Sequence, residues 1–90
     1  MKVLITGSAG FIGFHISKKF LENKFEVIGI DNFDNYYDVN LKKKRNKILL
    51  GFKKFKFYKK DIVKLNEIKK IFDNNKIDLV IHLAAQAGVR

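Results

Sequence analysis

The chain has 90 residues and a mass of 10.5 kDa, which is enough for one small domain and excludes two. Apolar residues make up 47% and charged residues 31%, so the composition is that of a globular domain and not of a disordered tail. The absence of cysteine excludes disulfides, cysteine-zinc sites and thiol catalysis. The apolar runs are too short for a signal peptide or a membrane span, so a cytoplasmic location is expected.

The formal net charge of +10 comes from one part of the chain. Residues 42–60, the basic window, contain ten cations and no acidic residue, whereas the rest of the chain balances nine cations with nine acids. Aromatic residues alternate with lysines in this window, a composition that suits single-stranded nucleic acid. The favoured interpretation is a solvated lysine-rich helix followed by an edge strand. A third interpretation is that the window steers an anionic ligand toward the sheet.

Short apolar runs alternate with helical patterns along the chain. In chain order, the expected elements are a strand over 2–6, a helix over 12–23, a strand over 25–30, a polar loop over 33–40, a basic stretch over 41–50 that allows a short helix, a strand over 55–58, a helix over 65–72 and a strand over 78–84. Such alternation of strands and helices predicts right-handed crossovers and a parallel sheet with helices on both faces.

The composition of the last two strands predicts their positions in the sheet. The strand over 55–58 is rich in lysine, as edge strands often are, and it is expected to bury its phenylalanines and expose Tyr58. The strand over 78–84 is apolar on both faces, which is typical of an interior strand. We therefore expect an α/β Rossmann-like, doubly wound parallel sheet with the order 3-2-1-4, of which only the first four strands are present and which is apparently truncated.

A glycine-rich turn joins the first strand to the first helix, with glycines at Gly7, Gly10 and Gly13. Such a turn lets the backbone approach a phosphate, and the free N–H groups and positive dipole end of the helix favour that anion. The spacing is Gly-x-x-Gly-x-x-Gly, which differs from the usual dinucleotide-binding fingerprint. The motif predicts a pyrophosphate site, and a turn that only reverses the chain is the alternative.

Polar or small residues follow the other strands at the edge where open parallel sheets bind ligands, beyond the carboxyl ends of the strands. Asp31 lies at the end of the second strand, 24 residues after Gly7, where its carboxylate can accept hydrogen bonds from ribose hydroxyls and repel a 2′-phosphate. Asp61 ends the third strand, and residues 83–86 follow the fourth. Together these positions favour NAD over NADP as the cofactor.

These motifs resemble the extended short-chain dehydrogenase/reductase family, the NAD-dependent epimerases and dehydratases of nucleotide sugars. The resemblance covers essentially all 90 residues, and 1–90 is interpreted as the N-terminal part of a NAD-binding Rossmann domain that lacks its catalytic and substrate-binding portion. Within the family, residues 31–38 and 84–90 look most like UDP-glucuronate 4-epimerases. The matching motifs are Thr-Gly-x-x-Gly-x-x-Gly at 6–13, Asp-Asn at 31–32, an aspartate and an aliphatic residue at 61–62, and His-x-Ala-Ala at 82–85.

The resemblance implies a role for each matching residue. The turn glycines and the amides of the first helical turn hold the pyrophosphate, the two residues at 31–32 hold the adenosine ribose, those at 61–62 flank the adenine, and 83–86 line the nicotinamide side. The implied NAD-binding residues are Gly7, Gly10, Phe11, Ile12, Gly13, Asp31, Asn32, Asp61, Ile62, Leu83, Ala84, Ala85 and Gln86. Gln86 and Arg90 would face the sugar, where a cation suits a uronate carboxylate.

The resemblance implies interconversion of UDP-glucuronate and UDP-galacturonate through transient oxidation at C4, which needs a serine or threonine and a Tyr-x-x-x-Lys pair. None of the three tyrosines is followed by lysine four residues later, so no catalytic residue is assigned and the chain is not expected to catalyse the reaction alone.

His15 and His82 lack metal-ligand spacing and are expected to pack, so no metal site is predicted. The full-length relatives are expected to be homodimers that take a UDP-sugar. A stand-alone NAD- or ADP-binding module without catalysis and, less favoured, a basic nucleic-acid-binding domain are the alternatives.

Overall fold

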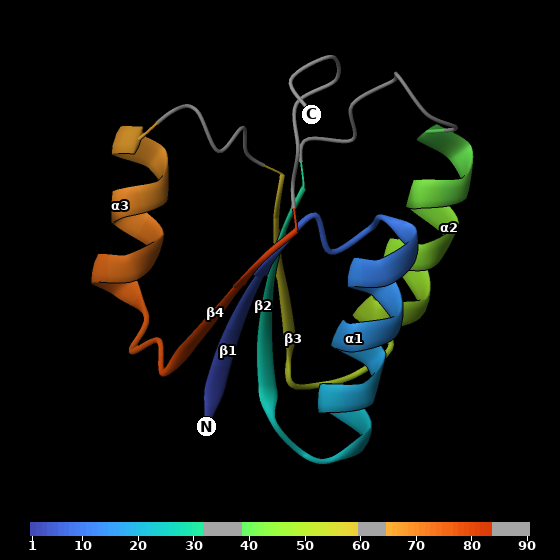
Figure 1. Cartoon of the computed structure of the whole chain (residues 1–90), viewed down its shortest axis with the longest axis horizontal. Coiled ribbons are helices and arrows are strands. Elements are labelled where there is room, and N and C mark those ends of the chain that lie inside the picture. Colours follow the sequence, from blue (N-terminus) through green and yellow to red (C-terminus); the bar gives the residue numbers. More distant parts are fainter. Residues whose placement is uncertain (32–38, 60–64, 84–90) are drawn as a thin grey trace.

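The structure is a computed structural model, and it describes residues 1–31, 39–59 and 65–83. Strands and helices alternate strictly along the chain (Figure 1). The elements are β1 (Lys2–Thr6), α1 (Phe11–Glu22), β2 (Glu26–Asp31), α2 (Val39–Leu50), β3 (Phe55–Lys59), α3 (Leu65–Asn74) and β4 (Leu79–His82). None of the helices within these ranges is both long and apolar enough to cross a membrane.

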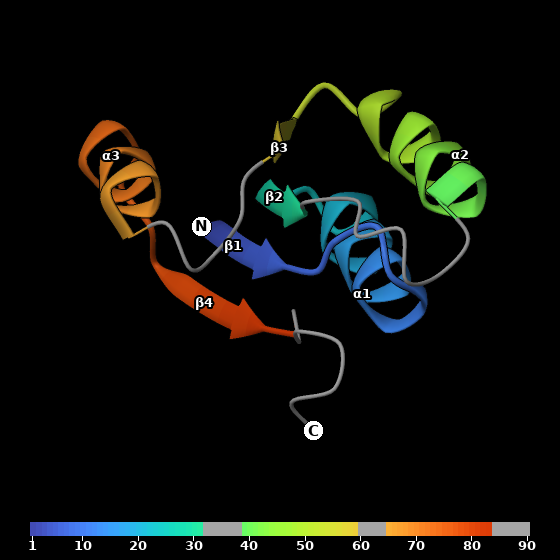
Figure 2. The same cartoon turned by 90° about the horizontal axis from the view of Figure 1, so that it is seen from above.

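The four strands form one parallel sheet in the order β3-β2-β1-β4. Helices α1 and α2 lie on one face of the sheet and α3 lies on the other (Figure 2). Each face has its own apolar core, since successive strand residues point to opposite sides. The α1 face is built around Val3, Ile5 and Val27, and the α3 face around Leu4 and Ile28. The predicted α/β class, the Rossmann-like layering and the strand order 3-2-1-4 are therefore confirmed.

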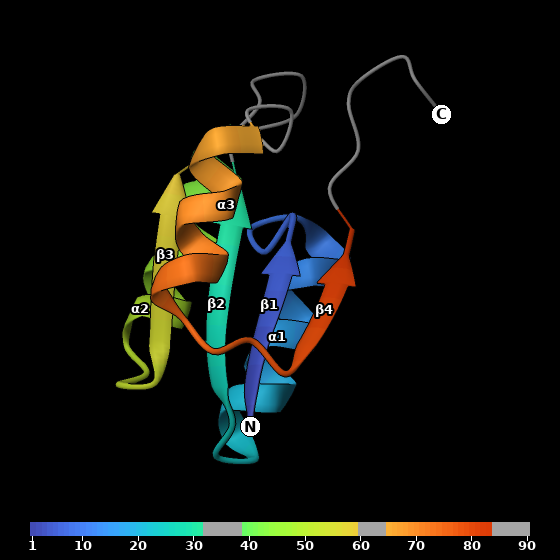
Figure 3. The ribbon, with the colours of Figure 1, turned by 90° about the vertical axis from the view of Figure 1, so that its left-hand side faces the viewer.

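Strand β4 pairs with β1 and forms an edge of the four-stranded sheet (Figure 3). Leu79 and Val80 lie on opposite faces of this strand, because they pair in register with Val3 and Leu4, and their exposed fractions are 41% and 46%. An apolar strand exposed on both faces is the pattern of an interior strand whose outer neighbours are missing. In the described sheet β4 is an edge strand, so the interior position that its composition predicts stays a prediction.

Several predicted boundaries differ from the observed ones. The loop predicted over 33–40 runs too far, because α2 begins at Val39 and continues for 12 residues. The last strand is shorter than predicted, since β4 ends at His82. The prediction that Tyr58 faces water is wrong, because this side chain is half-buried and packs against the core on the α3 face. Each face of β3 packs one aromatic residue against a core, Phe55 on the α1 side and Tyr58 on the α3 side, so alternation along the strand does not mark one wet side.

A buried hydroxyl in α1 offers a test of the packing. Ser17 is fully buried, and within the part of the chain that the structure describes its Oγ has no hydrogen-bond partner. We expect Ser17→Ala to raise the free energy of unfolding by about 1–2 kcal/mol, because it removes an unpaired buried hydroxyl and improves helix propensity. The measurement is the urea midpoint of each chain. Lys18→Ala on the same helix controls for propensity, and a loss of stability in Ser17→Ala would show that the hydroxyl has a favourable partner.

Candidate functional site

The glycine turn lies at the carboxyl end of β1 and is held by the neighbouring strand. Gly7 has a φ of 73°, in the left-handed region that favours glycine. Its N–H donates to the carbonyl of Ile30 in β2 at 2.7 Å, and the N–H of Gly10 donates to the carbonyl of Gly7 at 3.0 Å. These bonds fold the chain from the sheet directly into α1, as the sequence motif predicts.

Gly13 allows α1 to begin against this turn. A Cβ at Gly13 would lie 2.0 Å from the carbonyl oxygen of Gly7, a distance at which a side chain cannot exist. The turn and the helix are therefore in backbone-to-backbone contact. The N-cap residue is Gly10, so no side chain caps the amides of the first turn. Phe11 and Ile12, the first two residues of the helix, are exposed. The amides of this first turn therefore lie beside open surface, where a helix N-terminus favours an anion.

Asp31 ends β2 and its carboxylate faces the glycine turn. The residue is only 4% exposed, and its Oδ2 accepts a hydrogen bond from the backbone N–H of Ala9 at 3.0 Å. The turn that is predicted to hold a pyrophosphate and the carboxylate that is predicted to hold a ribose are thus in direct contact. The two strongest sequence signals belong to one site.

Two cations of the basic window also reach this site, which the sequence interpretation missed. Lys42 Nζ lies 3.3 Å from Asp31 Oδ1. Arg45 Nη1 donates to the carbonyl of Ala9 at 3.3 Å, and its guanidinium lies 5.6 Å from the centre of the Phe11 ring. A signal was present in the spacing, because Lys42, Arg45 and the buried Leu49 recur at helical intervals and mark the inner face of α2. The basic window is therefore not wholly a solvated face.

A hydrogen-bonded link joins the ends of β1 and β4. Thr6 Oγ1 lies 2.7 Å from His82 Nδ1, and the N–H of Leu83 donates to Thr6 Oγ1 at 3.0 Å. This link places Leu83 beside the start of the glycine turn. The prediction that His82 only packs is wrong, because its ring is exposed and hydrogen-bonded. His15 is exposed as well, and its ring contacts Phe11 and Phe14 edge-on.

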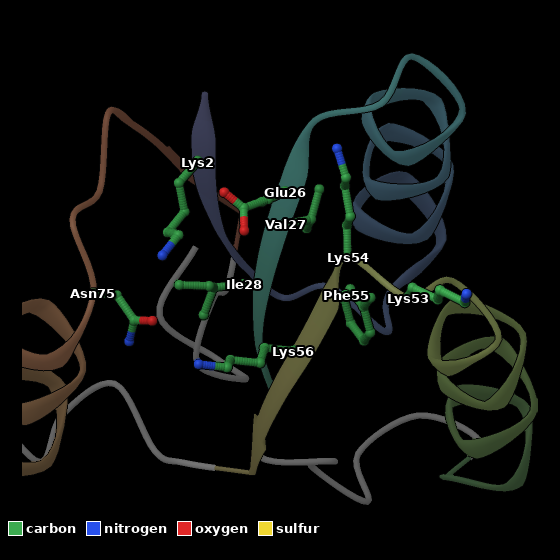
Figure 4. A pocket seen from close by; sticks show the side chains of 9 residues that line it. All are labelled: Lys2, Glu26, Val27, Ile28, Lys53, Lys54, Phe55, Lys56 and Asn75. Atoms are coloured by element: carbon green, nitrogen blue, oxygen red, sulfur yellow. The ribbon is translucent and has the colours of Figure 1, made fainter.

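A shallow pocket lies at the opposite edge of the sheet, near the amino ends of the strands (Figure 4). Its rim carries Lys2, Lys53, Lys54 and Lys56, with Glu26 among them. The cations do not converge, since Lys53 and Lys54 point away from Lys2 and Lys56 in Figure 4, and Lys54 Nζ donates to a backbone carbonyl. This pocket therefore does not form a phosphate cradle, and it is remote from the glycine turn.

The other predicted site residues lie outside the described residues. These are Asn32, Asp61, Ile62, Ala84, Ala85, Gln86 and Arg90. Among residues 1–31, 39–59 and 65–83, no group of three histidine, aspartate or glutamate side chains is arranged to hold a metal ion. The described part of the site thus consists of the glycine turn, the first turn of α1, Asp31, the two cations of α2 and Leu83.

Residues 4–90 match the protein family described as GDP-mannose 4,6 dehydratase. The chain belongs to this family. The match includes the glycine turn, Asp31 and the end of β4. The resemblance to NAD-dependent epimerases and dehydratases of nucleotide sugars is thereby confirmed.

Individual members of the family are similar over nearly the whole chain. A UDP-glucuronate 4-epimerase of Thermodesulfobacterium geofontis is 46% identical over 87 residues, which cover 97% of this chain and 27% of that enzyme. The crystal structure of UDP-glucuronic acid 4-epimerase from Bacillus cereus with UDP-glucuronic acid and NAD has a TM-score of 0.83 and 41% identity, covering 100% of this chain and 28% of that one.

A more distant relative supports the same fold. The UDP-glucose 4-epimerase of Thermotoga maritima, solved with UDP-glucose, has a TM-score of 0.74 and 36% identity over 97% of this chain and 25% of its own. The chain therefore spans little more than a quarter of the length of the relatives that it matches. The Bacillus cereus enzyme, on part of which this chain superposes, was solved with NAD.

Proposed function

We propose that the chain binds NAD and is the cofactor-binding portion of a nucleotide-sugar 4-epimerase that interconverts UDP-glucuronate and UDP-galacturonate. The observation that carries the proposal is the contact between the glycine turn and Asp31 through the N–H of Ala9. The UDP-glucuronic acid 4-epimerase of Bacillus cereus, solved with NAD, is 41% identical across the whole chain. This similarity supports the choice of NAD and of a uronate sugar.

The described residues suit a dinucleotide. The turn carries no side chain at Gly7, Gly10 and Gly13, and a Cβ at Gly13 would collide with the carbonyl oxygen of Gly7. In the proposal, the first-turn amides of Phe11 and Ile12 donate to the pyrophosphate, and Asp31 accepts from the adenosine ribose. When bound, NAD supplies a hydride acceptor for oxidation at C4 of the sugar. The side chains of this chain only bind and orient it.

The remaining assignments complete the proposal. Residues 83–86 line the nicotinamide side and Asp61 and Ile62 flank the adenine, while Gln86 and Arg90 face the sugar. The chain is not competent for catalysis alone, because Tyr36, Tyr37 and Tyr58 lack a lysine four residues later. Sequencing the coding DNA past the Arg90 codon tests this part. An open frame that supplies a serine or threonine and a Tyr-x-x-x-Lys pair supports the epimerase, whereas an immediate stop codon supports the stand-alone binding module.

Protection of the fold by the cofactor tests the binding itself. We expect NAD at about 100 times its Kd to add about 2.7 kcal/mol to the free energy of unfolding, because it binds only the folded chain. NADP at the same concentration should leave the thermal midpoint unchanged. Thermal unfolding followed by circular dichroism measures both effects. Absence of any shift in millimolar NAD would contradict the proposal.

The same chain can be tested as a nucleic-acid-binding domain. That alternative predicts a steep dependence of oligonucleotide affinity on salt and no effect of NAD. The structure weakens it, because Lys42 and Arg45 face the glycine turn and the lysines near the amino ends of the strands diverge. Tight, salt-sensitive oligonucleotide binding without a response to NAD would replace the dinucleotide proposal.

A further inference from the structure

A partly buried ion pair lies at the end of β2, where the ribose site is proposed. Lys42 in α2 and Asp31 at the end of β2 are joined at 3.3 Å, with side-chain exposures of 13% and 3%. The second carboxylate oxygen accepts the N–H of Ala9 in the glycine turn. Three elements, a strand end, a turn and a helix, thus meet at one carboxylate. This arrangement makes the Lys42 ammonium part of the cofactor edge.

The ion pair of Asp31 and Lys42 lies where the 2′-substituent of the adenosine ribose would contact it in the proposed complex. A 2′-hydroxyl can donate a hydrogen bond to Asp31, whereas a 2′-phosphate brings a second negative charge to the same carboxylate. Lysine is a good phosphate ligand when its ammonium is not already committed to a carboxylate. Arg45 lies one turn further along the same helix and contacts Ala9, so a second cation flanks the same turn. Within the described residues, the negative charge at this edge that contacts both Lys42 and the glycine turn is that of Asp31.

We propose that Lys42 is a latent ligand for a 2′-phosphate, which Asp31 keeps occupied, so that the two side chains together determine the choice of NAD over NADP. This inference rests on the proposed function, since it concerns the same dinucleotide site. Removal of the charge of Asp31 releases the ammonium of Lys42 for the phosphate. Removal of the charge of Lys42 leaves the carboxylate to repel the phosphate without compensation.

A double-mutant cycle on the full chain tests the inference. The variants are Asp31→Asn, Lys42→Met and the double variant, and Lys43→Met, an exposed neighbour on α2, is the matched control. Calorimetry gives the Kd of NAD and of NADP for each chain. Adenosine 2′,5′-bisphosphate against AMP repeats the comparison with probes that occupy only the adenosine end.

The expected result is a change in the ratio of the two affinities. Asp31→Asn should shift the preference toward NADP by about tenfold or more, the size of one charge-assisted hydrogen bond, and the double variant should lose that gain. Lys42→Met alone should lower the affinity for NADP relative to that for NAD. This variant therefore tests the inference even if Asp31→Asn does not fold. Lys43→Met should leave the ratio unchanged.

Two outcomes would overturn the inference and can be told apart. If Asp31→Asn and the double variant bind NADP equally well while the unaltered chain binds NAD, Lys42 plays no part in selectivity, although the proposed function stands. If the unaltered chain binds neither dinucleotide nor either adenosine probe, the proposed function fails and this inference fails with it.

Discussion

Gly13→Ala is expected to lower the free energy of unfolding by about 3 kcal/mol or more, the upper range for overpacking of a rigid site. The added Cβ would lie 2.0 Å from the carbonyl oxygen of Gly7 and 2.8 Å from its carbonyl carbon. Both are backbone atoms, so no side chain can rotate away, and α1 must move off the turn. The gain in helix propensity from alanine, about 1 kcal/mol, is too small to offset this displacement.

The turn provides its own control for this prediction. A Cβ at Gly10 would face the same oxygen of Gly7, but at 3.3 Å. Because Gly10 has an ordinary φ of −72°, Gly10→Ala should cost only about 1 kcal/mol, mostly from the poorer N-cap. Urea unfolding of the three chains measures the difference. If Gly13→Ala were as stable as Gly10→Ala, the close approach of α1 to the turn would not be essential to the fold.

The displacement of α1 also predicts a functional effect. The amides of Phe11 and Ile12 would move with the helix, away from the proposed position of the pyrophosphate. NAD should therefore no longer raise the thermal midpoint of any Gly13→Ala chain that still folds. A folded variant that retains full protection by NAD would separate the third glycine from cofactor binding.

The strand order could be predicted from the sequence because it depends on local composition. Short apolar runs separated by amphipathic helices leave few right-handed arrangements, and the lysines in 55–59 favour an edge position for β3, which the structure confirms. The extent of α2 could not be predicted in the same way. Its inner face carries Lys42, Arg45 and the buried Asn46 beside the apolar Leu49, so an analysis of apolar residues alone detects little of the helix.

The contacts of the site show a similar division. The glycine turn and Asp31 were predictable, because a phosphate-binding turn and a strand-end carboxylate have a characteristic spacing. The link between Thr6 and His82 joins residues that are 76 positions apart and follows only from the parallel register of β1 with β4. The ion pair of Asp31 with Lys42 depends on how α2 packs against α1 and β3, which charge counting along a basic window does not reveal.

Asp31→Ala is expected to weaken NAD binding by about 10- to 100-fold, which corresponds to the loss of hydrogen bonds to one charged group. The same change removes the acceptor of the Ala9 N–H and leaves Lys42 without its carboxylate, so stability should also fall, by about 1–3 kcal/mol. Weaker binding therefore has two possible origins. One is the loss of a ribose contact, and the other is distortion of the glycine turn.

The double variant Asp31→Ala/Lys42→Met separates these origins. It removes the isolated ammonium, so we expect it to recover part of the stability that Asp31→Ala loses. If Asp31 contacts the ribose, NAD affinity stays low in the double variant even as the urea midpoint rises, because the acceptor of the ribose hydroxyls is still missing. If NAD affinity returns together with stability, Asp31 acts only by holding the turn, and the ribose assignment is wrong. Unchanged affinity in Asp31→Ala itself would remove this carboxylate from the site altogether.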